Sequence, residues 1–304
     1  SAFAQKRLMD PRLRGEGPLK VMTYNMYAGT EYAGVTASDP AVFLQAVTDM
    51  FAEAEANDPA GRALAIARQI SITRPHLVSL QEVATWSRGP TRDDLTLEYD
   101  YLELLLDALD ALGEDYMPVA SLTTWDTIVP SSTGLYVRNT WREAILARAD
   151  LDPRHFSFTN IQAAPWSAGA TISFPLPALN GSSDCPVPLE ASGACMMPFP
   201  RGWVSVDVTY RNKQFRFIDA HLESKSASKN FLESLELLNG PALTALPVIV
   251  AGDLNCDLGN PESSKYQTCM NFLNTGFRDA WNEANPAEPG YTKHLPIMTE
   301  RSDY

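Results

Sequence analysis

Residues 247–255 read Pro-Val-Ile-Val-Ala-Gly-Asp-Leu-Asn, an apolar run that ends in a polar turn. The run Pro247–Ala251 predicts a buried central strand. Asp253 and Asn255 follow at its end, where a rigid sheet can hold polar side chains in place. By itself, an Asp-x-Asn after a strand is often only an Asx-turn or a helix cap. Its meaning depends on whether other strands end in the same way.

Three other strands predicted from the sequence also end in a polar side chain. Residues 19–25 alternate apolar and polar and end at Asn25, residues 76–82 end at Glu82, and residues 215–221 end at His221. Each of these side chains, taken singly, is more often a turn or surface residue than a catalytic one. Four such strand ends together indicate a shared site.

These strand ends carry the residue types that phosphoryl transfer needs. Glu82 offers an anionic ligand for Mg²⁺, and Asn25 offers a neutral amide oxygen that does not repel a phosphate. Asp253 can orient or deprotonate a water molecule. The amide of Asn255 and a protonated His221 can donate to the phosphate oxygens. The sequence therefore favours a metal-dependent phosphoesterase.

Four short motifs occur along the chain in this order: Tyr24-Asn25, Leu80-Gln81-Glu82-Val83, Ala220-His221-Leu222-Glu223 and Gly252-Asp253-Leu254-Asn255. Their order and rough spacing resemble the endonuclease/exonuclease/phosphatase (DNase-I-like) superfamily, from about Leu19 to Tyr304. That superfamily includes nucleases, inositol polyphosphate 5-phosphatases and bacterial sphingomyelinases.

The resemblance implies a four-layer α/β/β/α sandwich of two mixed, mainly antiparallel sheets. It also implies Mg²⁺-dependent hydrolysis of phosphoesters, with Mn²⁺ or Ca²⁺ as alternative ions. Glu82 would be the metal ligand and Asn25 a ligand or near-ligand. His221, Asp253 and Asn255 would surround the scissile phosphate, and Arg201 would bind the substrate.

The end of the chain departs from the family pattern. Glu300-Arg301-Ser302-Asp303-Tyr304 resembles a strand in which Asp303 would orient a catalytic His on the next strand. His294 precedes Asp303 and does not match that role. We therefore expect Asp303 to be catalytic but without its partner, and the domain to be incomplete at its C-terminus, lacking the last strand.

The domain organisation follows from the distribution of patterned segments. Residues 1–18 read as an N-terminal tail, and residues 19–304 as one domain in which strands outnumber helices. Residues 150–202 are rich in Pro, Ser and Gly, and are expected to form an insertion or long loops beside the site.

Charge and hydropathy bear on the substrate. The net charge of −13 gives a surface that repels phosphate backbones, so nucleic acid is not favoured as a partner. A phospholipid headgroup or a small phosphoester fits at least as well. The sequence contains no apolar run of membrane-spanning length. Several large apolar side chains between residues 150 and 202 either touch a lipid surface or cover the core, namely Trp166, Phe174, Met196, Met197 and Phe199. We also expect the protein to be a monomer.

A different function class stays open, namely a binding or interaction protein that keeps the fold but has lost catalysis. Turnover of a simple phosphodiester in the presence of Mg²⁺ separates the two.

The cysteines and the first residues bear on location. Two disulfides, Cys185–Cys195 and Cys256–Cys269, would suit an exported protein, and four free thiols would suit a cytoplasmic one. The start Ser1-Ala2-Phe3-Ala4 resembles the end of a signal peptide. Export to the periplasm or the extracellular space is therefore the prediction, with the cytoplasm as the alternative.

Overall fold

The computed structural model describes residues 17–37, 39–167, 172–176 and 195–288. Its strands are β1 (Val21–Asn25), β2 (Leu77–Gln81), β3 (Thr85–Thr91), β4 (Asp94–Asp100), β5 (Tyr116–Pro130), β6 (Tyr136–Arg148), β7 (Phe156–Pro165), β8 (Ile172–Leu176), β9 (Cys195–Phe199), β10 (Gly202–Tyr210), β11 (Lys213–His221) and β12 (Val248–Asp253). Its helices are α2 (Pro40–Ala56), α3 (Pro59–Thr73), α4 (Tyr101–Ala111), α5 (Ala227–Asn239), α6 (Tyr266–Asn274) and α7 (Ala280–Ala284).

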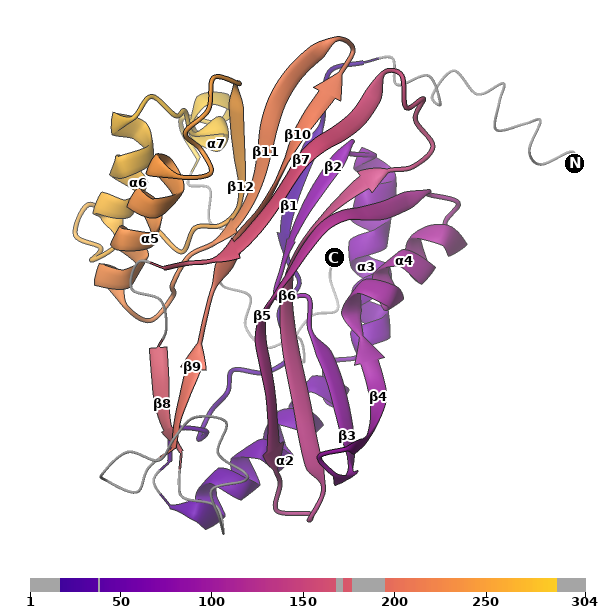
Figure 1. The fold of residues 1–304 in the computed structure, drawn as a ribbon, viewed down its shortest axis with the longest axis vertical. Coiled ribbons are helices and arrows are strands. Elements are labelled where there is room, and N and C mark those ends of the chain that lie inside the picture. The colour runs from indigo at the N-terminus through magenta and orange to yellow at the C-terminus, as the bar shows by residue number, and fades with distance from the viewer. Residues whose placement is uncertain (1–16, 38, 168–171, 177–194, 289–304) are drawn as a thin grey trace, which may run out of the picture.

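The strands form two large sheets (Figure 1). The six-stranded sheet has the order β1-β2-β6-β3-β4, with β5 also paired to β6, and the four-stranded sheet has the order β12-β11-β10-β7. In the six-stranded sheet β1 and β2 are parallel, in the four-stranded sheet β11 and β12 are parallel, and the other pairs are antiparallel. Strands β8 and β9 pair separately.

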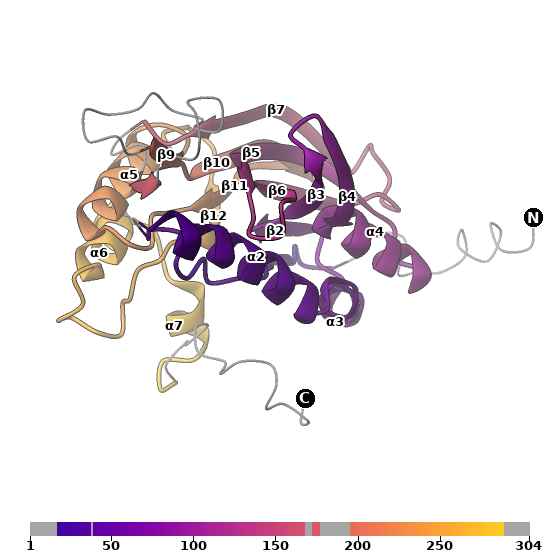
Figure 2. The ribbon, with the colours of Figure 1, turned by 90° about the horizontal axis from the view of Figure 1, so that it is seen from below.

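Three clusters of buried apolar side chains fill the space between the layers. Ile145 of β6 and Phe217 of β11 are fully buried in the layer between the two sheets. Leu105 of α4 packs with Leu80 of β2 in a second cluster, and Leu237 of α5 packs with Ile218 of β11 in a third. Figures 1 and 2 show α5 and α6 beside the four-stranded sheet and α3 and α4 beside the six-stranded one. The expected four-layer sandwich of mixed, mainly antiparallel sheets is confirmed. The expectation that the last strand is missing concerns residues outside the described ranges.

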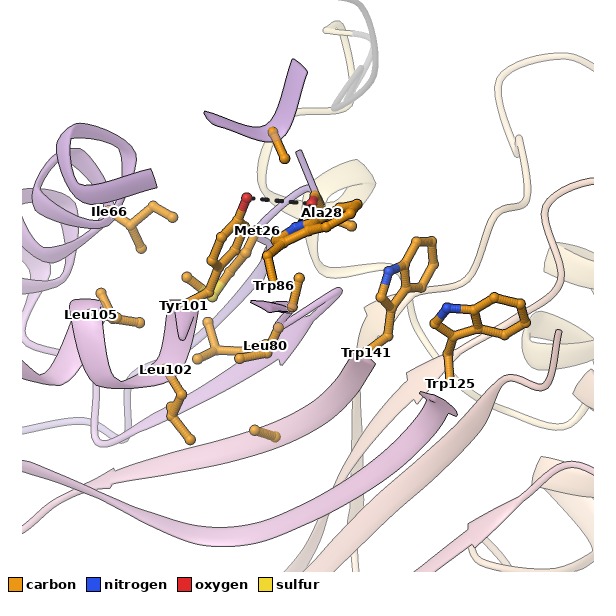
Figure 3. Packing of buried hydrophobic residues seen from close by; sticks show 14 of the residues in the cluster. Met26, Ala28, Ile66, Leu80, Trp86, Tyr101, Leu102, Leu105, Trp125 and Trp141 are labelled. Atoms are coloured by element: carbon orange, nitrogen blue, oxygen red, sulfur yellow. Dashed lines mark hydrogen bonds between the residues drawn. The ribbon is translucent and has the colours of Figure 1, made fainter. Parts of the chain in front are cut away.

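Two buried aromatic residues anchor the loop that follows β1 (Figure 3). The indole Nε1 of Trp86 donates to the carbonyl oxygen of Ala28 at 2.9 Å, and the hydroxyl of Tyr101 donates to the same oxygen at 3.3 Å. Trp86 and Ala28 are fully buried. The loop that begins just after Asn25 is therefore fixed to the hydrophobic core.

Strand β12 differs from the buried central strand expected at Pro247–Ala251. Among the described strands it lies at the end of its sheet, and all its residues are only half-buried. Its side chains are apolar because Val248 and Val250 pack toward α5 and α6, while Ile249 and Ala251 pack toward the other sheet. Burial of both faces explains the apolar run without requiring a neighbour on each edge.

Residues 150–202 contain more regular structure than the expected insertion or long loops. Residues Phe156–Pro165 form β7, which pairs along β10 with one register shift. Trp166, one of the residues weighed for lipid contact, is buried, and its Nε1 donates to the carbonyl oxygen of His221 at 2.8 Å. It therefore supports the site from the core. Among the described residues, no helix is both long and apolar enough to cross a membrane.

We predict that replacing His76 with Asn reduces the acid sensitivity of the fold. His76 is buried, its Nδ1 accepts from the backbone N–H of Lys20 at 3.1 Å, and burial together with Arg148 lowers its pKa to about 4. A lowered folded-state pKa gives stability that is present above about pH 6.5 and is lost as the pH falls toward 4. An Asn oxygen can accept the Lys20 bond but does not titrate.

Chemical denaturation at pH 7.5 and pH 5 measures this effect. The free energy of unfolding of the variant should fall by about 2 kcal/mol less between the two pH values than that of the parent chain. Buried acids contribute in the opposite direction in both proteins, so the difference between them is the informative quantity. Replacing the exposed His155 with Asn is the control, and an equal effect there would contradict the assignment to His76.

Candidate functional site

The four strand ends singled out in the sequence meet in space. Asn25 lies opposite Gln81 at the ends of the parallel strands β1 and β2, and Glu82 follows directly. His221 lies opposite Asp253 at the ends of the parallel strands β11 and β12. The two parallel pairs lie beside each other, one in each sheet (Figure 1). Side chains from distant parts of the chain therefore converge there.

The amide of Asn25 joins the two sheets. Its Nδ2 donates to Glu82 Oε1 and to Asp253 Oδ2, both at 3.0 Å. Its Oδ1 accepts from the backbone N–H of Tyr27 at 2.8 Å, which fixes the orientation of the amide. Glu82 Oε2 accepts from the N–H of Ala28 at 3.0 Å. One amide thus holds two carboxyl groups close together.

His221 is buried at the centre of this group. Its Nδ1 lies 3.0 Å from Glu143 Oε1, and its Nε2 lies 4.0 Å from Glu82 Oε1 and 3.8 Å from Asp253 Oδ2. Burial, and then the charge of Arg201, lower the pKa of His221 well below its usual value. The expected protonated imidazole is therefore wrong for this arrangement, because desolvation and a neighbouring cation both favour the neutral ring.

Arg201 brings a buried positive charge to the same place. Its guanidinium contacts the His221 ring, and its Nη2 donates to Ser224 Oγ at 2.9 Å. The guanidinium lies 5.7 Å from the ring centre of Trp141 and 5.6 Å from that of Phe199. These aromatic faces and the Ser224 hydroxyl fix the position of the cation.

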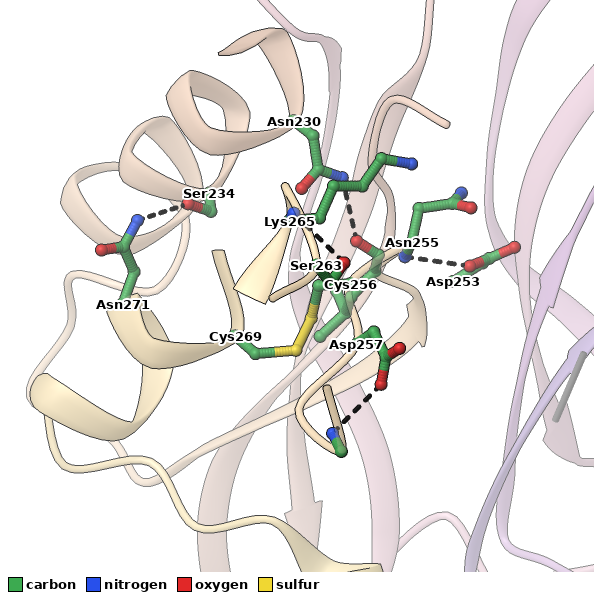
Figure 4. The surroundings of a disulfide bond; sticks show 12 residues. Asn230, Ser234, Asp253, Asn255, Cys256, Asp257, Ser263, Lys265, Cys269 and Asn271 are labelled. Atoms are coloured by element: carbon green, nitrogen blue, oxygen red, sulfur yellow. Dashed lines mark hydrogen bonds between the residues drawn. A yellow bond between two sulfur atoms is a disulfide. The ribbon is translucent and has the colours of Figure 1, made fainter. Parts of the chain in front are cut away.

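Two hydrogen bonds of Asn255 hold the Asp253–Asn255 turn, and Figure 4 shows the one to Asp253. The backbone N–H of Asn255 donates to Asp253 Oδ1 at 3.1 Å, and Asn255 Nδ2 donates to the carbonyl oxygen of Leu222 at 3.0 Å. The next residue, Cys256, forms the expected disulfide with Cys269 of α6. The Asn255 side-chain amide, which was expected to donate to a phosphate, therefore donates one of its hydrogens to the loop after β11. The Cys185–Cys195 pairing and Asp303 involve residues outside the described ranges.

Gly252 is required for close strand contact. A Cβ at this position would lie 2.0 Å from the carbonyl oxygen of Ala220 on β11, and the backbone φ is +145°. Three other residues at the site adopt positive φ although they are not glycine: Tyr27 at 61°, Glu82 at 55° and Asn255 at 47°. Such conformations persist only where surrounding contacts impose them, and they are typical of functional sites.

Two buried acids at the site were not selected from the sequence. Glu143 of β6 contacts His221, and burial raises its pKa well above the usual value. Asp219 of β11 accepts from Ser79 Oγ at 2.9 Å and from Gln81 Nε2 at 2.8 Å, and burial raises its pKa to about 8. Asp219 is two residues before His221, so the period of a strand places both on one face, and this signal was present in the sequence.

No family model and no curated protein sequence matches the chain. Solved structures that align with it include an endonuclease/exonuclease/phosphatase family protein from Leptotrichia buccalis, with 14% identity over 85% of this chain and 73% of that one and a TM-score of 0.45. The mannosyl-6-phosphatase of Bacteroides thetaiotaomicron has 16% identity over 85% and 71%, with a TM-score of 0.46. The human Nocturnin catalytic domain has 14% identity over 90% and 77%, with a TM-score of 0.46.

The family named for the first of these structures is the one that the four sequence motifs resemble. All three TM-scores lie below 0.5. The function proposed below therefore rests on the chain's own side chains.

We predict that Gly252→Ala destabilises the chain by about 3 kcal/mol, because the added methyl collides with the β11 backbone as well as straining its own. Gly276→Ala is the matched control. Gly276 also has positive φ, at 95°, but nothing lies within 4 Å of its missing Cβ, so only about 1 kcal/mol of strain is expected. Equal losses in chemical denaturation would contradict the close approach at Gly252.

Proposed function

We propose that the chain is a divalent-metal-dependent hydrolase of phosphoester bonds. The observation that carries the proposal is the Asn25 amide, which brings the carboxyl groups of Glu82 and Asp253 together beside buried His221 and Arg201. A hydrolase of this kind needs a cation site, a position for water and a positive charge for the phosphate.

The donor set fits a hard divalent cation. Among the described residues, no Lys or Arg forms an ion pair with Glu82 or Asp253, and their neighbour His221 is held neutral. Two adjacent carboxyl groups without a compensating cation are oxygen ligands of the kind that Mg²⁺ prefers. The Asn25 amide turns its Nδ2 toward these carboxyl groups, and its Oδ1 accepts from the N–H of Tyr27. Glu82 would hold the ion, with Asn25 beside it. When bound, the ion supplies positive charge that stabilises the phosphate oxygens.

The remaining side chains divide the other tasks. The side chain of Asp253 is 32% exposed, against 1% for His221, so it can reach a water molecule and orient or deprotonate it. Arg201 places a fixed positive charge where the phosphate oxygens would lie, and its position costs no rearrangement during the reaction. Neutral His221 and its partner Glu143 hold or move a proton at the imidazole nitrogens. The role of Asp303 as the residue that would orient a catalytic His stays a prediction.

The substrate proposed is a small phosphoester or a phospholipid headgroup rather than a long nucleic acid. The net charge of −13 disfavours a polyanion at long range, while a bound cation and Arg201 attract a single phosphate locally. A screen of short DNA, sphingomyelin and inositol phosphates separates these classes.

We predict that Glu82→Gln removes Mg²⁺-dependent hydrolysis of bis-p-nitrophenyl phosphate, by about 10³-fold or more. The change keeps the size of the side chain and an oxygen for the Ala28 N–H, but removes the charge that binds the cation. Titration calorimetry with Mg²⁺ should show a matching loss of binding, which gives a readout independent of turnover.

Glu103→Gln, an exposed change on α4, is the control and should leave both measurements unaltered. Unchanged turnover in Glu82→Gln would contradict the site. A parent chain that binds Mg²⁺ but hydrolyses none of the substrates would instead favour the alternative of a binding protein with this fold.

A further inference from the structure

Asn230 of α5 connects two loops, which directly follow the strand ends at His221 and Asp253. It is fully buried, and its Nδ2 donates to the carbonyl oxygen of Glu223 at 2.8 Å and to that of Leu254 at 3.1 Å. Glu223 lies in the loop after β11, and Leu254 in the turn after β12. One nitrogen atom of the helix therefore binds the backbone of both.

The strand ladder ends just before this point. The last backbone bond between the two segments runs from the N–H of Leu222 to the carbonyl oxygen of Asp253 at 3.0 Å. Beyond it, the carbonyl of Leu222 accepts from the side chain of Asn255, and the carbonyls of Glu223 and Leu254 accept from Asn230. Two asparagine amides thus continue the cross-link where the strands no longer pair.

The two carbonyls lie next to the residues with proposed roles. Glu223 directly precedes Ser224, whose hydroxyl accepts from Arg201. Leu254 lies between Asp253 and Asn255. Fixing these two peptide groups fixes the separation between the Arg201 side of the site and the Asp253 side.

An asparagine is specifically suited to this position. Both partners are acceptors, so the connecting atom must carry two donor hydrogens, and an amide NH₂ provides them without burying a charge. Its Oδ1 is buried and has no hydrogen-bond partner among the described residues. That unpaired oxygen is unfavourable, and its presence indicates that the two donor bonds are the reason for the residue.

We propose that Asn230 is a positioning residue that sets the spacing of the two loops of the active site. This proposal rests on the proposed function for its effect on turnover, but its structural half does not. The experiment therefore measures turnover and hydrogen exchange separately.

The test uses the full chain with Asn230→Leu, which keeps the approximate shape and removes both donors. Hydrogen exchange at the amides of Leu222 and Asn255, which donate to Asp253, should accelerate about tenfold or more. The kcat for bis-p-nitrophenyl phosphate should fall about 10- to 100-fold while KM changes less than about threefold, because misplaced groups affect the reacting geometry more than binding.

Asn271→Leu is the matched control. It removes the Nδ2–Ser234 Oγ bond of 2.9 Å between α6 and α5, but no bond to either loop, so exchange at Leu222 and Asn255 and kcat should stay near their original values. Asn230→Ser keeps one small donor and should give intermediate changes, and it decides the test if the Leu variant does not fold.

Unchanged exchange in the Asn230 variants, or an equal change in Asn271→Leu, would overturn the positioning role. A parent chain without turnover would contradict the proposed function, while the exchange result would still decide the role of Asn230.

Discussion

The carboxyl group of Asp219 makes a polar contact between the two sheets, and the rest of the site depends on this contact. It accepts from Ser79 and Gln81, which occupy alternate positions of β2, inside a layer that is largely apolar apart from the His221–Glu143 contact. Apolar packing alone would allow one sheet to slide over the other. A shift of one residue in β2 would turn both donors away and leave Asp219 buried without partners, which is costly. This contact therefore fixes how Glu82, which follows Gln81, meets His221.

The charges of the site change with depth. Burial raises the pKa values of Glu143 and Asp219 and lowers that of His221, so the interior favours uncharged forms of all three. Toward solvent, the carboxyl groups of Glu82 and Asp253 share the Asn25 amide. The sandwich thus presents the carboxyl groups of Glu82 and Asp253 on the more accessible side, and it favours uncharged forms of Glu143, Asp219 and His221 behind them.

The fold could largely be predicted because its signals are local. Apolar and polar residues alternate over 203–210 and 215–221, and these ranges agree closely with β10 and β11. The apolar stripe of residues 99–112 agrees with α4. Helix α2 was not predicted, although Asp39 caps it, Pro40 begins it, and its buried residues recur at helical spacing. The sequence patterns at residues 134–138 and 143–148 suggest two short strands. They belong to the single strand β6, because the residues between them pair with β3 and β5.

The site was predictable only in part. The sequence indicated which strand ends carry chemistry, and the parallel edges explain why Asn25, His221 and Asp253 meet. The protonation states of these side chains and the contacts that support them could not be predicted from the sequence. Glu143 and Asn230 acquire their roles only from contacts with distant segments. A buried Glu within a strand and an Asn within an amphipathic helix look ordinary until the tertiary structure supplies their partners.

The Asn25–Asp253 bond also has a consequence for biosynthesis. It joins residues 228 positions apart, one near the start of the domain and one near the end of the described chain. A polypeptide leaving the ribosome exposes Asn25 and Glu82 long before Asp253 exists, so the two acidic groups cannot be assembled on a partial product. The contact between the two sheets at this site therefore forms only after most of the described chain has been synthesised.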